Sequence, residues 1–168
     1  MSRGQVTSPC QGRRWTRSNT CCALMVAGGL LSLIWLRVNI EPSVPYGVYR
    51  LHALHAPLTR GTLVWLPVPA SVQRWHSRWA PLLKPIAAVA GDVVCVDDDG
   101  LHIGTEAYGR VYTEAGGSRL PQITGCLTVG AGEVFVASKN ARSLDSRYFG
   151  PVSIHDITAI ATPVLVWR

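Results

Sequence analysis

A serine and a lysine stand out in the sequence because each lies in a setting that could make it reactive. Ser43 lies in E-P-S-V-P-Y-G, where flanking prolines restrict the backbone that carries the hydroxyl. A serine hydroxyl is a poor nucleophile unless a base removes its proton. Lys84 lies in the apolar stretch P-L-L-K-P-I-A-A-V-A, where burial would lower the pKa of its amine. The two residues could together form a serine nucleophile with a lysine base.

Both settings also have an ordinary structural interpretation. The proline-flanked serine could belong to a stiff linker. Lys84 could lie at a helix-to-strand junction, with its ammonium group reaching out to water. The five histidines lie in no recognisable catalytic motif, and the other lysine, Lys139, lies in the polar stretch S-K-N-A-R. Lys84 is therefore the better candidate for a base.

A third segment, S-L-D-S-R-Y-F-G-P-V at residues 143–152, could support such a pair. Asp145 and Arg147 are spaced to form an ion pair or to brace a turn. The hydroxyl of Ser143 or Ser146 could orient a neighbouring amine. Taken alone, this segment indicates only a polar turn before a strand.

The most apolar stretch of the chain, CCALMVAGGLLSLIWL at residues 21–36, predicts a transmembrane helix. Sixteen helical residues span about 24 Å, and four more residues bring the length to that of a hydrocarbon layer of roughly 30 Å. We therefore expect a basic tail at 1–20 and an anchor at 21–40. A cleaved signal peptide and a buried core helix are the alternatives, but LRVNIEPS contains no small-residue cleavage site.

The distribution of charge predicts the orientation of this anchor. Four arginines precede the apolar stretch, and the first acidic residue of the chain, Glu41, follows it. Positive charge favours the cytoplasmic side, so we expect residues 41–168 outside the inner membrane, in the periplasm of a bacterium. Most of the net charge of +6 comes from the N-terminal arginines. The nearly neutral remainder gives no indication of a nucleic-acid partner.

The region after the anchor predicts a mainly β, antiparallel domain. Short runs of β-branched and aromatic residues are separated by glycine, proline and aspartate. The stretch D-D-D-G at 97–100 predicts a hairpin turn. Residues 70–82 break this pattern, because Trp75 and Trp79 are spaced for one face of a short amphipathic helix. Such a helix could pack on the sheet or lie on anionic lipid headgroups.

Two of the five cysteines, Cys95 and Cys126, lie in the predicted outer domain. An oxidising compartment makes them a candidate disulfide. The cysteines and histidines do not show metal-ligand spacing, so we predict neither a metal nor a cofactor.

Together, the three polar segments resemble the membrane-bound signal peptidase I superfamily, and most closely its TraF-type branch from conjugative plasmid transfer. S-V-P-Y-G-V-Y resembles the nucleophile box, with Ser43 as the attacking residue, and L-L-K-P-I-A-A-V-A-G-D resembles the lysine box, with Lys84 as the base. The segment at 143–152 resembles the last box. The resemblance implies that Ser143 holds the lysine and that Asp145 and Arg147 form a structural ion pair.

Some positions differ from those of signal peptidases proper. These enzymes have methionine after the nucleophile, where this chain has Val44, and proline three residues on, where this chain has proline at plus two. They also have a serine two residues before the nucleophile, which completes the oxyanion hole, and this chain has Glu41 there. The differences favour the conjugation branch.

The resemblance implies a membrane-anchored serine endopeptidase with a signal-peptidase-like β domain and an acyl-enzyme mechanism. The expected partners are the membrane and a membrane-inserted, pro-pilin-like precursor, cut after small residues. Hydrolysis and cyclisation of the product both remain open. The alternatives are a general type I signal peptidase, an autoproteolytic repressor-like protein and a non-catalytic, membrane-anchored assembly protein of a conjugation apparatus.

Overall fold

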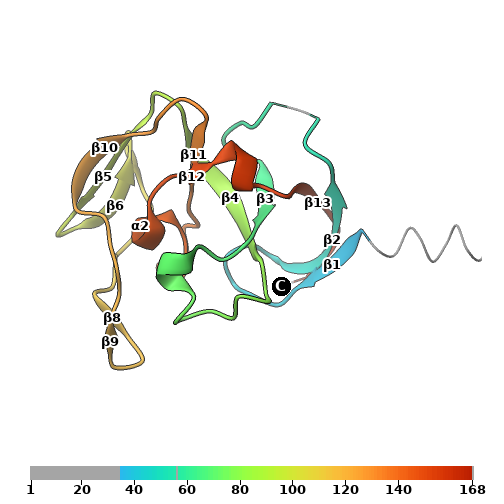
Figure 1. Ribbon diagram of the computed structural model, residues 1–168, viewed down its shortest axis with the longest axis horizontal. Helices are drawn as coiled ribbons and strands as arrows, with labels where there is room; N and C mark the ends of the chain where they lie inside the picture. Colours follow the sequence, from blue (N-terminus) through green and yellow to red (C-terminus); the bar gives the residue numbers. More distant parts are fainter. Residues whose placement is uncertain (1–34, 56, 168) are drawn as a thin grey trace, which may run out of the picture. The chain divides into compact units, whose positions relative to one another are not determined.

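The computed structural model describes residues 35–55 and 57–167, which form a mainly β unit. Its larger sheet has seven strands, joined by antiparallel pairs. In spatial order these are β1 (Leu36–Asn39), β2 (Tyr46–His52), β13 (Ala159–Trp167), β3 (Leu63–Leu66), β4 (Leu82–Val89), β11 (Glu133–Val136) and β12 (Val152–Ser153) (Figure 1). The prediction of an antiparallel, mainly β fold is confirmed.

The remaining described strands form a second sheet of four strands and a two-stranded hairpin. In order, the second sheet holds β10 (Gly125–Thr128), β5 (Val93–Asp97), β6 (Gly100–Ile103) and β7 (Glu106–Ala107), and the hairpin holds β8 (Glu114–Ala115) and β9 (Ser118–Arg119). The described helices are short: η1 (Ala70–Val72), α2 (Ser146–Phe149) and η2 (Ile154–Asp156).

The predicted hairpin turn at 97–100 is confirmed. Asp97 pairs with Gly100 at the junction of β5 and β6. The carboxylate of Asp97 accepts hydrogen bonds from the backbone N–H groups of Asp99 and Gly100, which is the local bonding that favours aspartate in turns.

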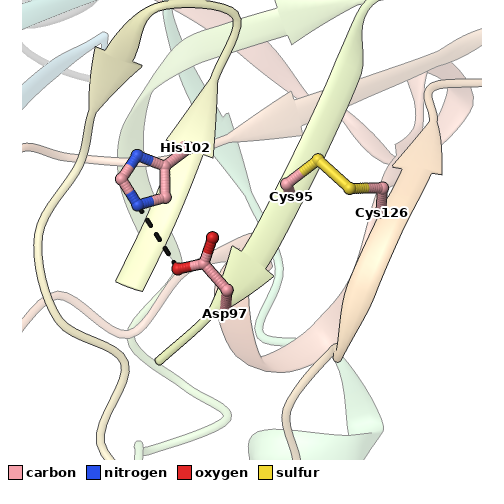
Figure 2. Close-up of a disulfide and its surroundings, with 4 residues drawn as sticks. All are labelled: Cys95, Asp97, His102 and Cys126. Carbon is pink, nitrogen blue, oxygen red and sulfur yellow. Dashed lines mark ion pairs between the residues drawn. A yellow bond between two sulfur atoms is a disulfide. The ribbon is translucent and has the colours of Figure 1, made fainter. Parts of the chain in front are cut away.

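A disulfide joins Cys95 on β5 to Cys126 on β10, two residues that lie directly opposite each other in the antiparallel pair (Figure 2). On the other side of β5, His102 and Asp97 form an ion pair. The disulfide joins two strands of the four-stranded sheet and links residues that are 31 positions apart in the sequence.

Strand β4 connects the two apolar cores of the domain. Its residues are buried on both faces, so the strand shows no alternation of apolar and polar residues. Ile86 packs in a cluster with side chains from β3, β11 and β12, and Ala87 and Ala88 pack with side chains from β5 and β6. Lys84 is the one charged residue of this buried strand.

The prediction of an amphipathic helix at 70–82 is wrong. The segment forms the short helix η1 and then a series of turns. The two tryptophans lie in different environments instead of on one helix face: Trp75 packs against the core and donates from Nε1 to the carbonyl oxygen of Ala115, whereas Trp79 is exposed. These tertiary contacts outweigh the weak helical tendency of a segment too short to form a stable helix alone.

The predicted anchor at 21–40 falls mostly outside the described residues, as does the predicted tail at 1–20. At its C-terminal end the prediction of a helix is wrong, because Leu36–Asn39 forms β1. Strand β2 provides an edge with which these residues pair, for example Val38 with Val48. Within residues 35–55 and 57–167, the helices are all too short to cross a bilayer.

Candidate active site

Ser43 lies in the tight turn between β1 and β2, and its neighbours hold that turn in one conformation. The buried side chain of Asn39 donates from Nδ2 to the carbonyl oxygens of Glu41 at 2.8 Å and Val44 at 3.3 Å. Asn39 thereby binds the backbone on both sides of Ser43. The stiff linker considered from the sequence is in fact a turn packed into the domain.

The segment after β11 binds the same turn from the opposite side. Ser138 donates from its hydroxyl to the carbonyl oxygen of Ser43 at 2.6 Å. Asn140 donates from Nδ2 to the carbonyl oxygen of Pro42 at 3.1 Å. The backbone of Ser43 is therefore fixed by hydrogen bonds from a segment about 95 residues away in sequence.

Lys84 reaches this turn from the middle of β4. Its side chain is 1% exposed, so it does not extend to water as the snorkelling alternative requires. A hydrogen bond joins Nζ of Lys84 to Oγ of Ser43. Oγ of Ser143 lies 3.2 Å from each of these two atoms. The structure thus brings together Ser43, Lys84 and Ser143 in one buried, three-membered hydrogen-bond network.

Burial lowers the pKa of the Lys84 amine below the ordinary value for lysine. The charge of Arg147 acts in the same direction. The carboxylates of Glu41 and Asp145 raise the pKa but do not cancel the effect of burial. A lysine with a lowered pKa can be neutral near neutral pH, and only the neutral amine can accept the proton of Ser43.

Asp145 and Arg147 form a fully buried ion pair beneath the site. Nε of Arg147 donates to Oδ1 of Asp145 at 2.7 Å, and an Nη donates to Oδ2 at 3.1 Å. The same guanidinium donates to the carbonyl oxygen of Ser138 at 2.6 Å, and Asp145 accepts from the backbone N–H of Ser138 at 3.1 Å. The pair therefore positions Ser138, which in turn holds the carbonyl group of Ser43.

Ser146, which the sequence offered beside Ser143 as a possible hydroxyl for the amine, lies elsewhere. Its Oγ accepts from the backbone N–H of Val136 at 3.1 Å and so fixes α2 to the end of β11. Ser143 is the hydroxyl that reaches Lys84.

A pocket of about 480 Å³ opens beside the Ser43 and Lys84 side chains. Its lining combines the polar residues of the site with apolar side chains, including Trp75, Leu120 and Leu144. A second hollow of about 710 Å³ reaches the other side of Ser43. Ser43 therefore lines a hollow on each side of its turn.

The sequence did not reveal the roles of Ser138, Glu41 and His76. Ser138 showed no local signal because its contacts depend on the long connection to the Ser43 turn. Glu41 stood out in the sequence as the first acidic residue after the predicted anchor and as a difference from signal peptidases, not as a neighbour of the base. Its carboxylate in fact lies between Nζ of Lys84, at 3.6 Å, and Nε2 of His76, at 2.7 Å.

The comparisons with known proteins agree with this geometry. The family model described as "Signal peptidase, peptidase S26" matches residues 14–167. This match covers nearly the whole chain, and the chain belongs to that family.

Among individual proteins, the chain is similar to proteins named for conjugal or plasmid transfer. It is 30% identical over 155 residues to "Conjugal transfer protein TraF" of Agrobacterium tumefaciens (strain 15955), covering 79% of this chain and 83% of that protein. It is 28% identical over 162 residues to "Plasmid transfer protein TraF" of Escherichia coli, covering 86% and 89%. A signal peptidase I from Enterococcus faecalis V583 is a solved structure with 25% identity and a TM-score of 0.41, covering 66% of this chain and all of that one.

Proposed function

We propose that the chain is a serine endopeptidase in which Ser43 is the nucleophile and Lys84 the general base. The observation that carries the proposal is the hydrogen bond between Nζ of Lys84 and Oγ of Ser43, with the lysine buried and its pKa lowered. A base must lie within hydrogen-bond reach of the proton that it removes and must be unprotonated. Membership of the signal peptidase family supports the same reaction.

The reaction has two steps. Ser43 Oγ attacks the carbonyl carbon of the scissile peptide bond while neutral Lys84 takes the hydroxyl proton. The C–N bond then breaks, the leaving amine receives the proton from Lys84, and the acyl group stays on Ser43 as an ester. Water then attacks the ester carbonyl as it loses a proton to Lys84, and Lys84 returns that proton to Oγ of Ser43 when the C–O bond of the ester breaks and the acid product leaves. Ser143 orients the lysine amine through its hydrogen bond.

We further propose that the substrate is a membrane-inserted precursor, with a pilin of a conjugation apparatus as the particular case. The names of the similar transfer proteins support this substrate class. Ser43 follows the last residue of β1 by four positions, so the nucleophile lies within a short reach of the chain that leads from the predicted anchor. Small residues before the cut are expected, as in the family resemblance.

An exposed apolar surface beside Ser43 supports action at a bilayer. Strands β1 and β13 flank β2 on both sides, and apolar side chains of these strands and their ends are exposed to solvent. They are Val38, Ile40, Tyr46, Val164, Leu165, Val166 and Trp167. Exposed apolar side chains gathered on neighbouring strands favour a contact site at this edge of the sheet. Since it adjoins the end of the predicted anchor, the lipid surface is the occupant that we propose.

The proposed location is the bacterial inner membrane, with the catalytic domain in the periplasm. The test is a pair of C-terminal fusions of the full chain, to alkaline phosphatase and to a fluorescent protein that matures only in the cytoplasm. We expect an active phosphatase and a dark fluorescent fusion in the membrane fraction. Bright fluorescence would contradict the proposed orientation.

Co-expression with a candidate pilin precursor tests the activity. We expect the wild-type chain to shorten the precursor, and the Ser43→Ala and Lys84→Met variants to leave it intact at equal expression. The matched control is the Ser71→Ala variant, in which an exposed serine is changed in the same way. We expect this variant to cleave the precursor like the wild type. Equal cleavage by the wild type and Ser43→Ala would overturn the assignment. Equal absence of cleavage, with several precursors, would favour the non-catalytic assembly protein.

The mass of the product separates hydrolysis from cyclisation. Hydrolysis gives a linear peptide with free ends, whereas transfer of the acyl group to the substrate's own N-terminus gives a product lighter by one water. Cleavage of ordinary secretory precursors at the same rate as the pilin would instead indicate a general signal peptidase.

A further inference from the structure

Glu41 places a carboxylate directly over the proposed base. It lies two residues before Ser43 in the same tight turn, and its Oε2 is 3.6 Å from Nζ of Lys84. Its other oxygen, Oε1, is 2.7 Å from Nε2 of His76. The carboxylate is thus held between a ring that binds it and the amine that it faces.

His76 is positioned to hold this carboxylate. Its Nδ1 lies 3.1 Å from the carbonyl oxygen of Ser77 while Nε2 faces Glu41. The carboxylate is an acceptor only, so Nε2 of His76 carries the hydrogen of this bond and donates it to Glu41. This contact bridges residues 35 positions apart.

The amine of Lys84 has three neighbours with oxygen atoms: Ser43, Ser143 and Glu41. A neutral amine has two N–H bonds and one lone pair. If the two N–H bonds point to Ser143 and Glu41, the lone pair is left for the hydroxyl proton of Ser43. That is the orientation that proton transfer requires.

We propose that Glu41 is a positioning residue for the base: its carboxylate, fixed by His76, keeps the lone pair of Lys84 directed at Ser43. The inference rests on the proposed function, because it concerns how that base is aimed. The serine that signal peptidases proper have at this position cannot carry a charge next to the lysine. In this chain, the carboxylate of Glu41 both orients the amine of Lys84 and raises its proton affinity.

The charge of Glu41 has a measurable consequence. Burial raises the pKa of the Glu41 carboxyl, but the hydrogen bond from His76 and the charges of Lys84 and His76 lower it overall, so the group is ionised at neutral pH. Within residues 35–55 and 57–167, the charges of Glu41 and Asp145 raise the pKa of the Lys84 amine, and the charge of Arg147 lowers it. Removing the charge of Glu41 should therefore lower the pKa of Lys84 further. The acid limb of the activity profile would then move to lower pH.

The test compares Glu41→Gln and Glu41→Ala with the wild type in full-length protein, using cleavage of the pilin precursor across pH. The other charged residues that line the pocket, Glu114 and Arg142, stay unchanged in every variant. Glu41→Gln keeps a side-chain oxygen near the amine but removes the charge. We expect its acid limb at lower pH, with a plateau kcat within about threefold of the wild type.

Glu41→Ala removes the nearby side-chain oxygens as well as the charge. We expect a plateau kcat lower by about ten- to a hundredfold, the order expected when a reacting group loses its orientation, with KM little changed. Glu106→Gln is the matched control, because it removes the same charge from an exposed carboxylate paired with Lys139. Its profile should match that of the wild type.

An acid limb of Glu41→Gln that coincides with that of the wild type would overturn the inference. So would a Glu41→Ala variant with an unchanged plateau. If Glu41→Ala fails to fold, the profile of Glu41→Gln decides alone. A failure of the proposed function is distinguishable, since in that case Ser43→Ala would cleave as well as the wild type.

Discussion

The four-stranded sheet and the candidate site bury different kinds of side chain. The buried side chains of β5 and β6, in the four-stranded sheet, are apolar, namely Val94, Val96, Leu101 and Ile103, and a disulfide links β5 to β10 within that sheet. In the described part of the chain, the buried polar and charged side chains lie around the candidate site instead. They are Asn39, Ser43, Lys84, Ser138, Ser143, Asp145, Ser146 and Arg147.

This difference separates stability from chemistry. Burying a polar group is unfavourable unless it is hydrogen-bonded, and burying an unpaired charge has a larger free-energy cost. The four-stranded sheet avoids this penalty and relies on apolar contacts and a covalent link. In the candidate site, the buried polar and charged groups form hydrogen bonds and an ion pair with one another, which offsets the cost of their burial. Substitutions in the first region should therefore change stability alone, whereas those in the second should change activity, stability or both.

The largest effect is expected from breaking the buried ion pair. Arg147→Leu leaves the carboxylate of Asp145 buried without a partner and removes the donor to the carbonyl oxygen of Ser138. Breaking such a pair typically costs about 3 to 5 kcal/mol. Urea denaturation measures the loss, with the exposed Arg119→Leu as control, expected within about 0.5 kcal/mol of the wild type. A loss below about 1 kcal/mol for Arg147→Leu would show that the pair is not structural.

A smaller effect is expected from removing the disulfide of the other sheet. The double variant Cys95→Ser, Cys126→Ser opens a loop of 31 residues, and we expect a loss of about 2 to 4 kcal/mol in the free energy of unfolding. The kcat of the folded protein should not change, because the disulfide lies in the four-stranded sheet and the residues of the candidate site lie elsewhere. A fall in kcat at a temperature where the variant is fully folded would break the distinction between the two regions. Intact mass with and without reductant verifies the bond in the wild type.

Removing the hydroxyl that holds the lysine should reduce activity with little effect on stability. Ser143→Ala deletes one neutral hydrogen bond to Lys84, worth about 1 kcal/mol, which corresponds to a loss of roughly five- to tenfold in kcat. KM should stay near that of the wild type. Steady-state kinetics measures both. An unchanged kcat would mean that Lys84 is oriented without Ser143.

The sequence predicted the polar residues of the site better than the elements that carry them. Short, one-face-buried strands such as β2 alternate apolar and polar residues and were recognisable. Strand β4 was not, because it is buried on both faces and contains Pro85, which is unusual inside a sheet. The sequence placed Lys84 only in an apolar stretch, with a helix-to-strand junction as the alternative interpretation, and did not identify the strand in which it lies.

The contacts that complete the site could not be predicted from local patterns. Glu41 and His76 meet only because the turn before β2 and the turns after η1 pack together, and a pattern read along the chain contains no sign of that contact. The failed helix prediction has the same cause. Trp75 and Trp79 have helical spacing, but the core and the β8–β9 hairpin bind only the first of them.

The central claim is that the amine of Lys84 is neutral where the reaction takes place, and it can be measured directly. The chain has two lysines, so a protein labelled with ¹³C at the lysine ε-carbon gives two signals, and Lys84→Met identifies one of them. Lys139 serves as the internal reference, because its hydrogen bond to Glu106 raises its pKa. We predict that the Lys84 signal titrates below the ordinary lysine pKa and that activity rises with pH through the same midpoint. A Lys84 signal that titrates together with that of Lys139, at or above the ordinary value, would contradict the account.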